Sequence, residues 1–152
     1  MAKLVLLIVS AVAVICVYGT SVAADLDRNQ AALELKAKAD ECKNQVNAKD
    51  SDLEELASRK PASTKEGKCL RACLMKKFEV MDANGKFVAD VAEKHAAKIT
   101  DGSADKMKMA REIISACANI EVSSDHCEAA EAYGKCFKDQ AAAHGINEDY
   151  EF

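Results

Sequence analysis

The spacing of the cysteines constrains the fold of this 152-residue chain more than any other feature of its sequence. One of the seven cysteines, Cys16, lies in an apolar segment at the start of the chain. The other six are separated by 26, 3, 43, 9 and 8 residues; they are Cys42, Cys69, Cys73, Cys117, Cys127 and Cys136. Six spaced cysteines in a short secreted chain indicate a framework of three disulfides, so it matters whether this chain is secreted.

Residues 1–24 have the pattern of a secretory signal peptide. Lys3 gives a positive start, Leu4 to Tyr18 form an apolar run, and Val22-Ala23-Ala24 is a small-residue cleavage site. The alternative is a membrane anchor, but a spanning helix needs about 20 apolar residues, and no basic flank follows this shorter run. We therefore expect cleavage after Ala24 or Ala23, a secreted protein with no membrane insertion, and one mature domain at residues 25–152. Cleavage also removes Cys16.

The mature sequence is typical of an all-helical protein. Ala, Lys, Glu and Leu, which favour helices, dominate it, and no alternation of β-branched and aromatic residues marks a strand. Turn signals such as Asn84-Gly85 and Asp101-Gly102 divide it into about six segments. We expect helices from Asp27 to Ala48, from an Asp50-Ser51-Asp52 cap to Ser58, after a Thr64 cap, from Phe87 to Ile99, from a Ser103 cap through Cys117, and from Ser123-Ser124-Asp125 to His144.

Helical geometry limits how the six cysteines can pair. Cys69 and Cys73 lie one turn apart on one helix, where a bridge between them would distort the helix. Cys127 and Cys136 lie about 13.5 Å apart along the axis of another helix, beyond the reach of about 7 Å for a disulfide. Of the fifteen possible pairings ten remain, and the residues alone do not choose among them.

Charge and motifs exclude several classes of function. The net charge is −4 and there is no basic block, which argues against binding to nucleic acid or to anionic membranes. The sequence has no Gly-x-Ser-x-Gly elbow, phosphate-binding loop or His-Glu-x-x-His motif. The loop around Gly85 matches a calcium-binding EF-hand only at its glycine, because Val80 and Val91 stand at ligand positions. We expect no enzymatic activity, no metal and no cofactor.

The cysteine spacing resembles that of the insect odorant-binding proteins. That family has three residues between its second and third cysteines and eight between its fifth and sixth, as in Cys69-Leu70-Arg71-Ala72-Cys73 and in Cys127 to Cys136. The resemblance covers the whole mature chain. It implies a compact bundle of six helices around an apolar cavity that holds a small volatile or lipid-like ligand. It also implies the pairing Cys42–Cys73, Cys69–Cys127 and Cys117–Cys136, which is one of the ten that helical geometry allows.

The apolar stripes of the expected helices supply candidates for ligand binding. A disulfide framework lets a small domain tolerate an internal void, because the bridges lower the entropy of the unfolded chain. Each of these side chains has the alternative role of filling a dry core. The candidates are Phe78, Met81, Phe87, Val88, Val91, Met107, Ile113, Ile114, Tyr133 and Phe137.

Two histidines and the C-terminal tail are candidates for control of such a cavity. His95 lies on the apolar face of its helix and His144 stands next to the tail. Protonation of either imidazole at mildly acidic pH is therefore a hypothesis for loosening the pocket. The tail, Ile146 to Phe152, either folds over the pocket as a lid or is a frayed terminus.

Two functions remain. The preferred one is an extracellular carrier that reversibly binds small hydrophobic molecules, such as odorants or pheromones, and delivers them to a membrane odorant receptor. The alternative is a secreted, disulfide-stabilised helical protein that acts on a protein partner in a structural or defence role. Saturable uptake of a fluorescent apolar probe distinguishes the two.

Overall fold

The computed structural model describes residues 29–100 and 102–146 of the chain. The expected signal peptide and most of the C-terminal tail, residues 147–152, for which a lid and a frayed terminus were both open, lie outside the described residues. The chain divides into two compact units, Met1–Lys38 and Ala39–Phe152. In the first unit the described residues, 29–38, are helical, and the second unit begins with the helical residues 39–46.

Five further helices make up the second unit, and the all-helical fold predicted from the sequence is confirmed. They are α2 (Asp50–Ala57), α3 (Lys65–Lys77), α4 (Ala89–Ile99), α5 (Ala104–Ala118) and α6 (His126–Ala143). The extended pairing in the described part of the chain is a single isolated bridge between Met81 and Phe87. No helix among the described residues is long and apolar enough to cross a membrane.

Three of the expected caps begin helices in the structure. The side chain of Thr64 accepts a hydrogen bond from the backbone N–H of Gly67 at the start of α3. Ser103 caps α5, and the carboxylate of Asp125 accepts hydrogen bonds from the first N–H groups of α6. These side chains satisfy donors that have no partner within their own helix, which fixes where each helix begins.

Two predicted helix starts were wrong. The cap of α2 is Lys49 rather than Asp50, because Asp52 at the third helical position accepts a hydrogen bond from the N–H of Lys49 at 2.7 Å. α4 begins at Ala89 rather than Phe87. The N–H of Phe87 donates to the hydroxyl of Tyr133, so a contact distant in sequence holds this residue outside the helix.

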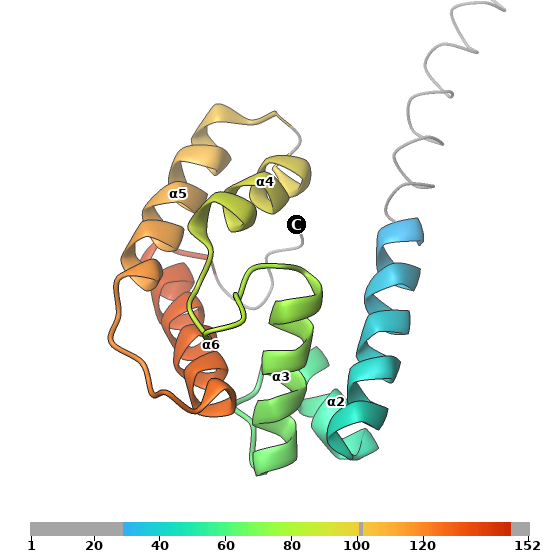
Figure 1. Ribbon diagram of the computed structural model, residues 1–152. Helices are drawn as coiled ribbons and strands as arrows, with labels where there is room; N and C mark the ends of the chain where they lie inside the picture. The colour runs from blue at the N-terminus through green and yellow to red at the C-terminus, as the bar shows by residue number, and fades with distance from the viewer. Residues whose placement is uncertain (1–28, 101, 147–152) are drawn as a thin grey trace, which may run out of the picture. The chain divides into compact units, whose positions relative to one another are not determined.

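Helix α3 runs through the centre of the second unit and buries two faces. It packs against α2 on one side and lies beside α6 on the other, while α5 packs against both α4 and α6 (Figure 1). Two clusters of buried residues result. The α2-side core is Cys42, Ala48, Leu70 and Leu74, and the α6-side core is Ala72, Met81, Ala129, Ala130 and Tyr133.

Three disulfides link the helices of the second unit. The structure pairs Cys42 with Cys73, Cys69 with Cys127, and Cys117 with Cys136, which is the pairing that the family resemblance implies. Cys69 and Cys73 of α3 therefore bond to different helices, one to α6 and the other to the helix at residues 39–46. α4 carries no cysteine and has no fully buried residue.

Candidate functional site

Three aromatic rings meet on the inner side of α6. The ring of Phe87 lies 5.5 Å from that of Tyr133 and 5.2 Å from that of Phe137, measured between centroids. Tyr133 is 1% exposed, and the two phenylalanines are partly buried against the α6-side core. These three residues, the aromatic cluster, form the largest group of apolar rings that the described residues bring together.

The hydroxyl of Tyr133 is the polar group of the aromatic cluster. It accepts a hydrogen bond from the N–H of Phe87 at 3.2 Å. A tyrosine hydroxyl can also donate a hydrogen bond, and it is the one side-chain donor that the aromatic cluster offers to a bound molecule.

The structure distributes the ten candidate residues over several places. Met81, Phe87, Tyr133 and Phe137 lie together in or against the α6-side core. Phe78 packs instead against the α2-side core. Ile113 and Ile114 are buried on α5, whereas Val88, Val91 and Met107 are half-buried around α4 and the start of α5.

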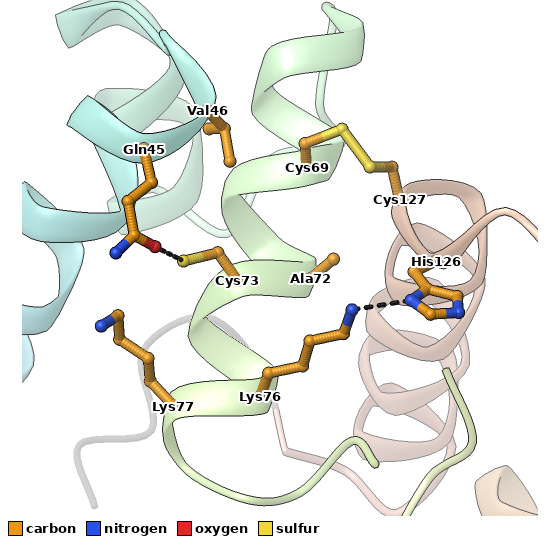
Figure 2. Close-up of a pocket in the computed structure, with 9 residues that line it drawn as sticks. All are labelled: Gln45, Val46, Cys69, Ala72, Cys73, Lys76, Lys77, His126 and Cys127. Atoms are coloured by element: carbon orange, nitrogen blue, oxygen red, sulfur yellow. Dashed lines mark hydrogen bonds between the residues drawn. A yellow bond between two sulfur atoms is a disulfide. The ribbon is translucent and has the colours of Figure 1, made fainter. Parts of the chain in front are cut away.

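A groove on the outside of the second unit was not expected from the sequence. It has a volume of about 480 Å³ and none of the ten candidates lines it. Residues 45 and 46 form one wall, α3 forms the floor, and the first residues of α6 form the other wall (Figure 2). The lining of this α3–α6 groove is Gln45, Val46, Cys69, Ala72, Cys73, Lys76, Lys77, His126 and Cys127.

The groove has an apolar part and a cationic end. Val46, Ala72 and the Cys69–Cys127 bridge supply the apolar surface (Figure 2). At the other end Lys76 Nζ lies 2.6 Å from Nδ1 of His126. Because an ammonium group only donates hydrogen bonds, Nδ1 is the acceptor and the neutral ring carries its proton on Nε2.

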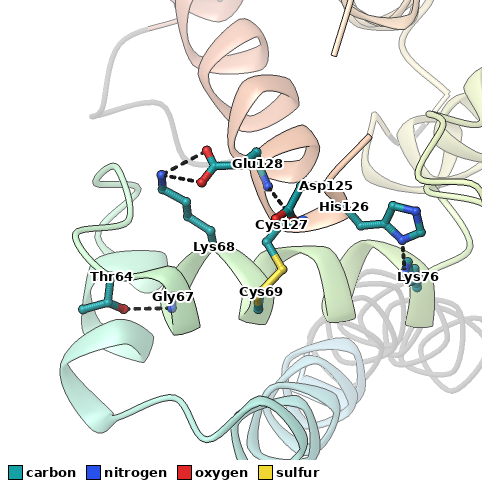
Figure 3. The surroundings of a disulfide bond; sticks show 9 residues. All are labelled: Thr64, Gly67, Lys68, Cys69, Lys76, Asp125, His126, Cys127 and Glu128. Atoms are coloured by element: carbon teal, nitrogen blue, oxygen red, sulfur yellow. Dashed lines mark hydrogen bonds and ion pairs between the residues drawn. A yellow bond between two sulfur atoms is a disulfide. The ribbon is translucent and has the colours of Figure 1, made fainter. Parts of the chain in front are cut away.

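Three links join α3 to the first turn of α6 along this groove (Figure 3). Lys68 Nζ lies 3.0 Å from both carboxylate oxygens of Glu128, the Cys69–Cys127 bridge follows, and the Lys76–His126 hydrogen bond completes the series. A signal for this arrangement was present in the sequence. Once Cys69 is bonded to Cys127, a residue two turns after Cys69 on α3, Lys76, faces the neighbour of Cys127, His126.

Two carboxylates near His126 are already bound to the backbone. The pKa of Asp82 is held below its ordinary value, mainly by the N–H of Lys86 and also by that of Asn84. The pKa of Asp125 is lowered by the N–H groups of Cys127 and Glu128.

The structure gives the two other histidines ordinary partners. His95 Nε2 lies 3.1 Å from the carbonyl oxygen of Phe78, and its ring meets the Phe78 ring edge-on. His144 Nδ1 lies 3.8 Å from a carboxylate oxygen of Glu112. Their roles as pH switches stay a prediction. Within residues 29–100 and 102–146, no group of three or more His, Cys, Asp or Glu side chains is placed to hold a metal ion.

Comparison with known proteins finds a family model and relatives that match most of the chain. The model of the PBP/GOBP family matches residues 24–140. The chain is 43% identical to general odorant-binding protein 28a of Drosophila melanogaster, over 87% of this chain and 92% of that protein. It is 37% identical to general odorant-binding protein 19d of the same species, over 89% of each chain.

A solved structure of one of these relatives is also similar in fold. The Drosophila melanogaster odorant-binding protein 28a superposes with a TM-score of 0.71 and 46% sequence identity, over 78% of this chain and 98% of that one. The family match covers well over half of the chain, and two relatives exceed 30% identity over most of its length. The chain therefore belongs to the PBP/GOBP family of odorant-binding proteins.

Proposed function

We propose that this protein is an extracellular carrier that reversibly binds small hydrophobic molecules and delivers them to a membrane odorant receptor. The observation that carries the proposal is membership of the PBP/GOBP family, whose curated relatives are general odorant-binding proteins. Three disulfides support an extracellular setting, because such bridges persist in oxidising compartments. The signal-peptide pattern at residues 1–24 supports it independently.

The proposed ligand site is the interior beside the aromatic cluster. Apolar ligands bind in sites lined mainly by hydrophobic and aromatic side chains, with few polar groups to orient them. Phe87 and Phe137 supply ring surface, and Met81 a flexible, polarizable neighbour. The hydroxyl of Tyr133 would donate its proton to an oxygen atom of the ligand. Ile113, Ile114, Val88, Val91 and Met107 form the proposed remainder of the site, and Phe78 is left out because it packs in the other core.

A probe-displacement experiment tests the carrier function. The full chain is expressed through a secretory route, recovered oxidised, freed of lipid, and titrated with the fluorescent apolar probe N-phenyl-1-naphthylamine. We expect saturable uptake that dodecanol or a long-chain ester displaces, and no saturable uptake by the reduced and alkylated chain. Absence of uptake by the oxidised protein would contradict the proposal and favour the alternative function on a protein partner.

The mass of the secreted protein tests the proposed processing. We expect a chain that begins at Asp25 or at Ala24 and carries six oxidised cysteines. A product that retains residues 1–24, or one that stays with the membrane fraction, would contradict both the signal peptide and the proposed extracellular location.

A further inference from the structure

The α3–α6 groove has a composition that an interior site for volatile ligands does not explain. It lies on the surface, none of the ten candidate residues lines it, and its volume of about 480 Å³ falls within the range of small-molecule sites. Its surface combines an apolar floor with a lysine ammonium at one end (Figure 2). The groove therefore offers two different chemistries to one elongated molecule.

The apolar part would shelter a hydrocarbon chain. Val46 and Ala72 line the groove, and on its α6 side the sulfur atoms of the Cys69–Cys127 bridge present a soft, polarizable surface without a charge (Figure 2). The one polar group on this side is Gln45, whose Oε1 lies 3.3 Å from Sγ of Cys73. Because Cys73 is bonded to Cys42, its sulfur has no proton to donate, and this approach is a van der Waals contact.

The cationic end is set by Lys76. The neighbouring Lys77 is paired with Glu41, whose carboxylate oxygen lies 2.6 Å from its Nζ. Lys76 by contrast forms its hydrogen bond with a neutral acceptor, Nδ1 of His126, and no carboxylate in the described part of the chain is ion-paired with it. One of its three N–H donors is used in this bond, so two remain for an anion.

The acidic residues nearby do not cancel this charge by direct contact. Asp82 points its carboxylate at the N–H groups of Asn84 and Lys86, and Asp125 points its carboxylate at those of Cys127 and Glu128. Both carboxylates are therefore held by backbone donors. The charge that faces the groove opening at this end is the ammonium of Lys76, which suits an anionic head and disfavours a cationic one.

We propose that the α3–α6 groove is a second binding site, separate from the interior, for a single-chain amphiphile with a carboxylate head. The hydrocarbon chain lies along Val46, Ala72 and the Cys69–Cys127 bridge, and the carboxylate accepts hydrogen bonds from Lys76. A neutral molecule of the same length lacks the charge-assisted contact, and a cationic one is repelled. This site does not depend on the proposed carrier function of the interior.

Laurate is the probe that tests the site. Its binding to the oxidised protein is followed by NMR through the amide resonances of Gln45 and Val46 and the ring resonances of His126, which line the groove and lie outside the α6-side core. We expect laurate to shift these resonances saturably, dodecanol to shift them much less, and dodecylammonium not to shift them. A laurate titration that leaves all three residues unmoved would overturn the proposal.

Charge variants supply the second test. Lys76→Gln should weaken binding of laurate at these resonances by about 2- to 5-fold, in the range expected for one exposed ion pair. Lys76→Glu should abolish it. Lys94→Gln, which removes an exposed lysine of α4 outside the groove, should leave it unchanged. Equal laurate affinity in Lys76→Gln and the parent protein would overturn the assignment of the head to Lys76.

The two binding proposals fail separately. Displacement of N-phenyl-1-naphthylamine by dodecanol reports on the interior and should be the same in Lys76→Gln and in the parent protein. Loss of laurate binding at the groove with normal probe uptake would contradict the groove alone. Laurate binding at the groove without probe uptake would contradict the carrier function alone.

Discussion

Gly85 lies directly against the imidazole ring of His126, so that a Cβ atom built on this glycine would stand 2.5 Å from Cδ2 of the ring. The glycine also has a φ of 75°, in the left-handed region. It closes the turn in which the N–H of Asp82 donates to the carbonyl of Lys86 and the N–H of Gly85 donates to the carbonyl of Asp82. Backbone conformation and close approach thus both require glycine here.

Replacement of Gly85 by alanine should destabilise the protein in two ways. The left-handed conformation costs a residue with a Cβ about 1–2 kcal/mol. The clash with His126 adds a further penalty of about 1–3 kcal/mol, because the ring must move away from its bond with Lys76. Guanidinium unfolding of the oxidised protein measures the sum.

Gly102→Ala is the matched control. Gly102 also has a φ of 75°, but nothing lies within 4 Å of a Cβ built on it. This variant should therefore show the conformational cost alone, and the difference between the two variants isolates the contact with His126. Equal destabilisation by both substitutions would contradict a steric role for His126.

The charge of Asp52 should stabilise the loop between α2 and α3 in a pH-dependent way. Asp52 is 2% exposed, and its carboxylate accepts hydrogen bonds from the Thr64 hydroxyl at 2.6 Å and from the N–H of Lys49. These bonds, that of Thr64 first, lower the pKa of Asp52 below its ordinary value of 3.8. Asp52→Asn should cost about 1–3 kcal/mol at neutral pH, as expected for loss of hydrogen bonds to a charged group.

The pH dependence follows from the direction of the shift. A carboxyl group whose pKa is lowered on folding stabilises the protein above its unfolded pKa, and this stability is lost as the pH falls through the folded value. The difference in unfolding free energy between the parent and Asp52→Asn should therefore be constant from neutral pH down to about pH 4 and shrink below that. In Asp139→Asn, a change of an exposed residue paired with Lys135, we expect a difference of at most about 0.5 kcal/mol. If the difference in unfolding free energy between the parent and Asp52→Asn grew as the pH fell, the lowered pKa of Asp52 would be contradicted.

The bridges should differ in their contributions to stability. The Cys69–Cys127 bridge joins residues 58 apart in sequence, and the Cys117–Cys136 bridge joins residues 19 apart. The chain-entropy model predicts that the longer closure stabilises the protein by about 1 kcal/mol more than the shorter one. Paired serine variants of each bridge, compared by denaturant unfolding with the other two bridges intact, measure this difference. A larger loss from the shorter bridge would show that native packing, not loop length, decides the order.

Substitutions in the two cores should have different effects on ligand binding. Phe137 lies in the aromatic cluster and Phe78 packs against the α2-side core, although both are partly buried phenylalanines. Phe137→Ala removes ring surface from the proposed site and should weaken N-phenyl-1-naphthylamine binding by about 10-fold, which is about 1.4 kcal/mol. Phe78→Ala should lower stability while the affinity for the probe stays within about 2-fold of the parent value. The same loss of affinity in both variants would place the site elsewhere.

Local signals predicted the parts of the fold that depend on neighbouring residues. Thr64, Ser103 and Asp125 were expected to cap helices, and they do, because a capping side chain bonds to N–H groups two or three residues later. Asn84-Gly85 was expected to break the chain, and Gly85 has the required left-handed conformation. The family resemblance, carried by the cysteine spacing, named the pairing that the structure contains.

Contacts between distant residues account for what the sequence could not predict. The start of α4 was misplaced because the N–H of Phe87 is held by Tyr133, which stands 46 positions later. The α3–α6 groove was missed because Lys76 and His126 belong to different helices. In the sequence only the Cys69–Cys127 bridge relates the two helices, and the residues alone left that pairing open. Phe78 was grouped with the ligand site because α3 buries two faces, and an apolar residue at its end does not reveal which one it serves.

The position of α4 has a consequence for how a ligand could reach the interior. This helix has no cysteine and no fully buried residue, and its main packing partner is α5. Outward movement of α4 would leave all three covalent cross-links in place. The free energy of such a local opening is smaller than that of global unfolding. A hydrophobic ligand can therefore exchange rapidly while the cross-linked helices stay folded. The bridges lie outside α4, so the stability of the fold and the rate of ligand entry depend on different helices.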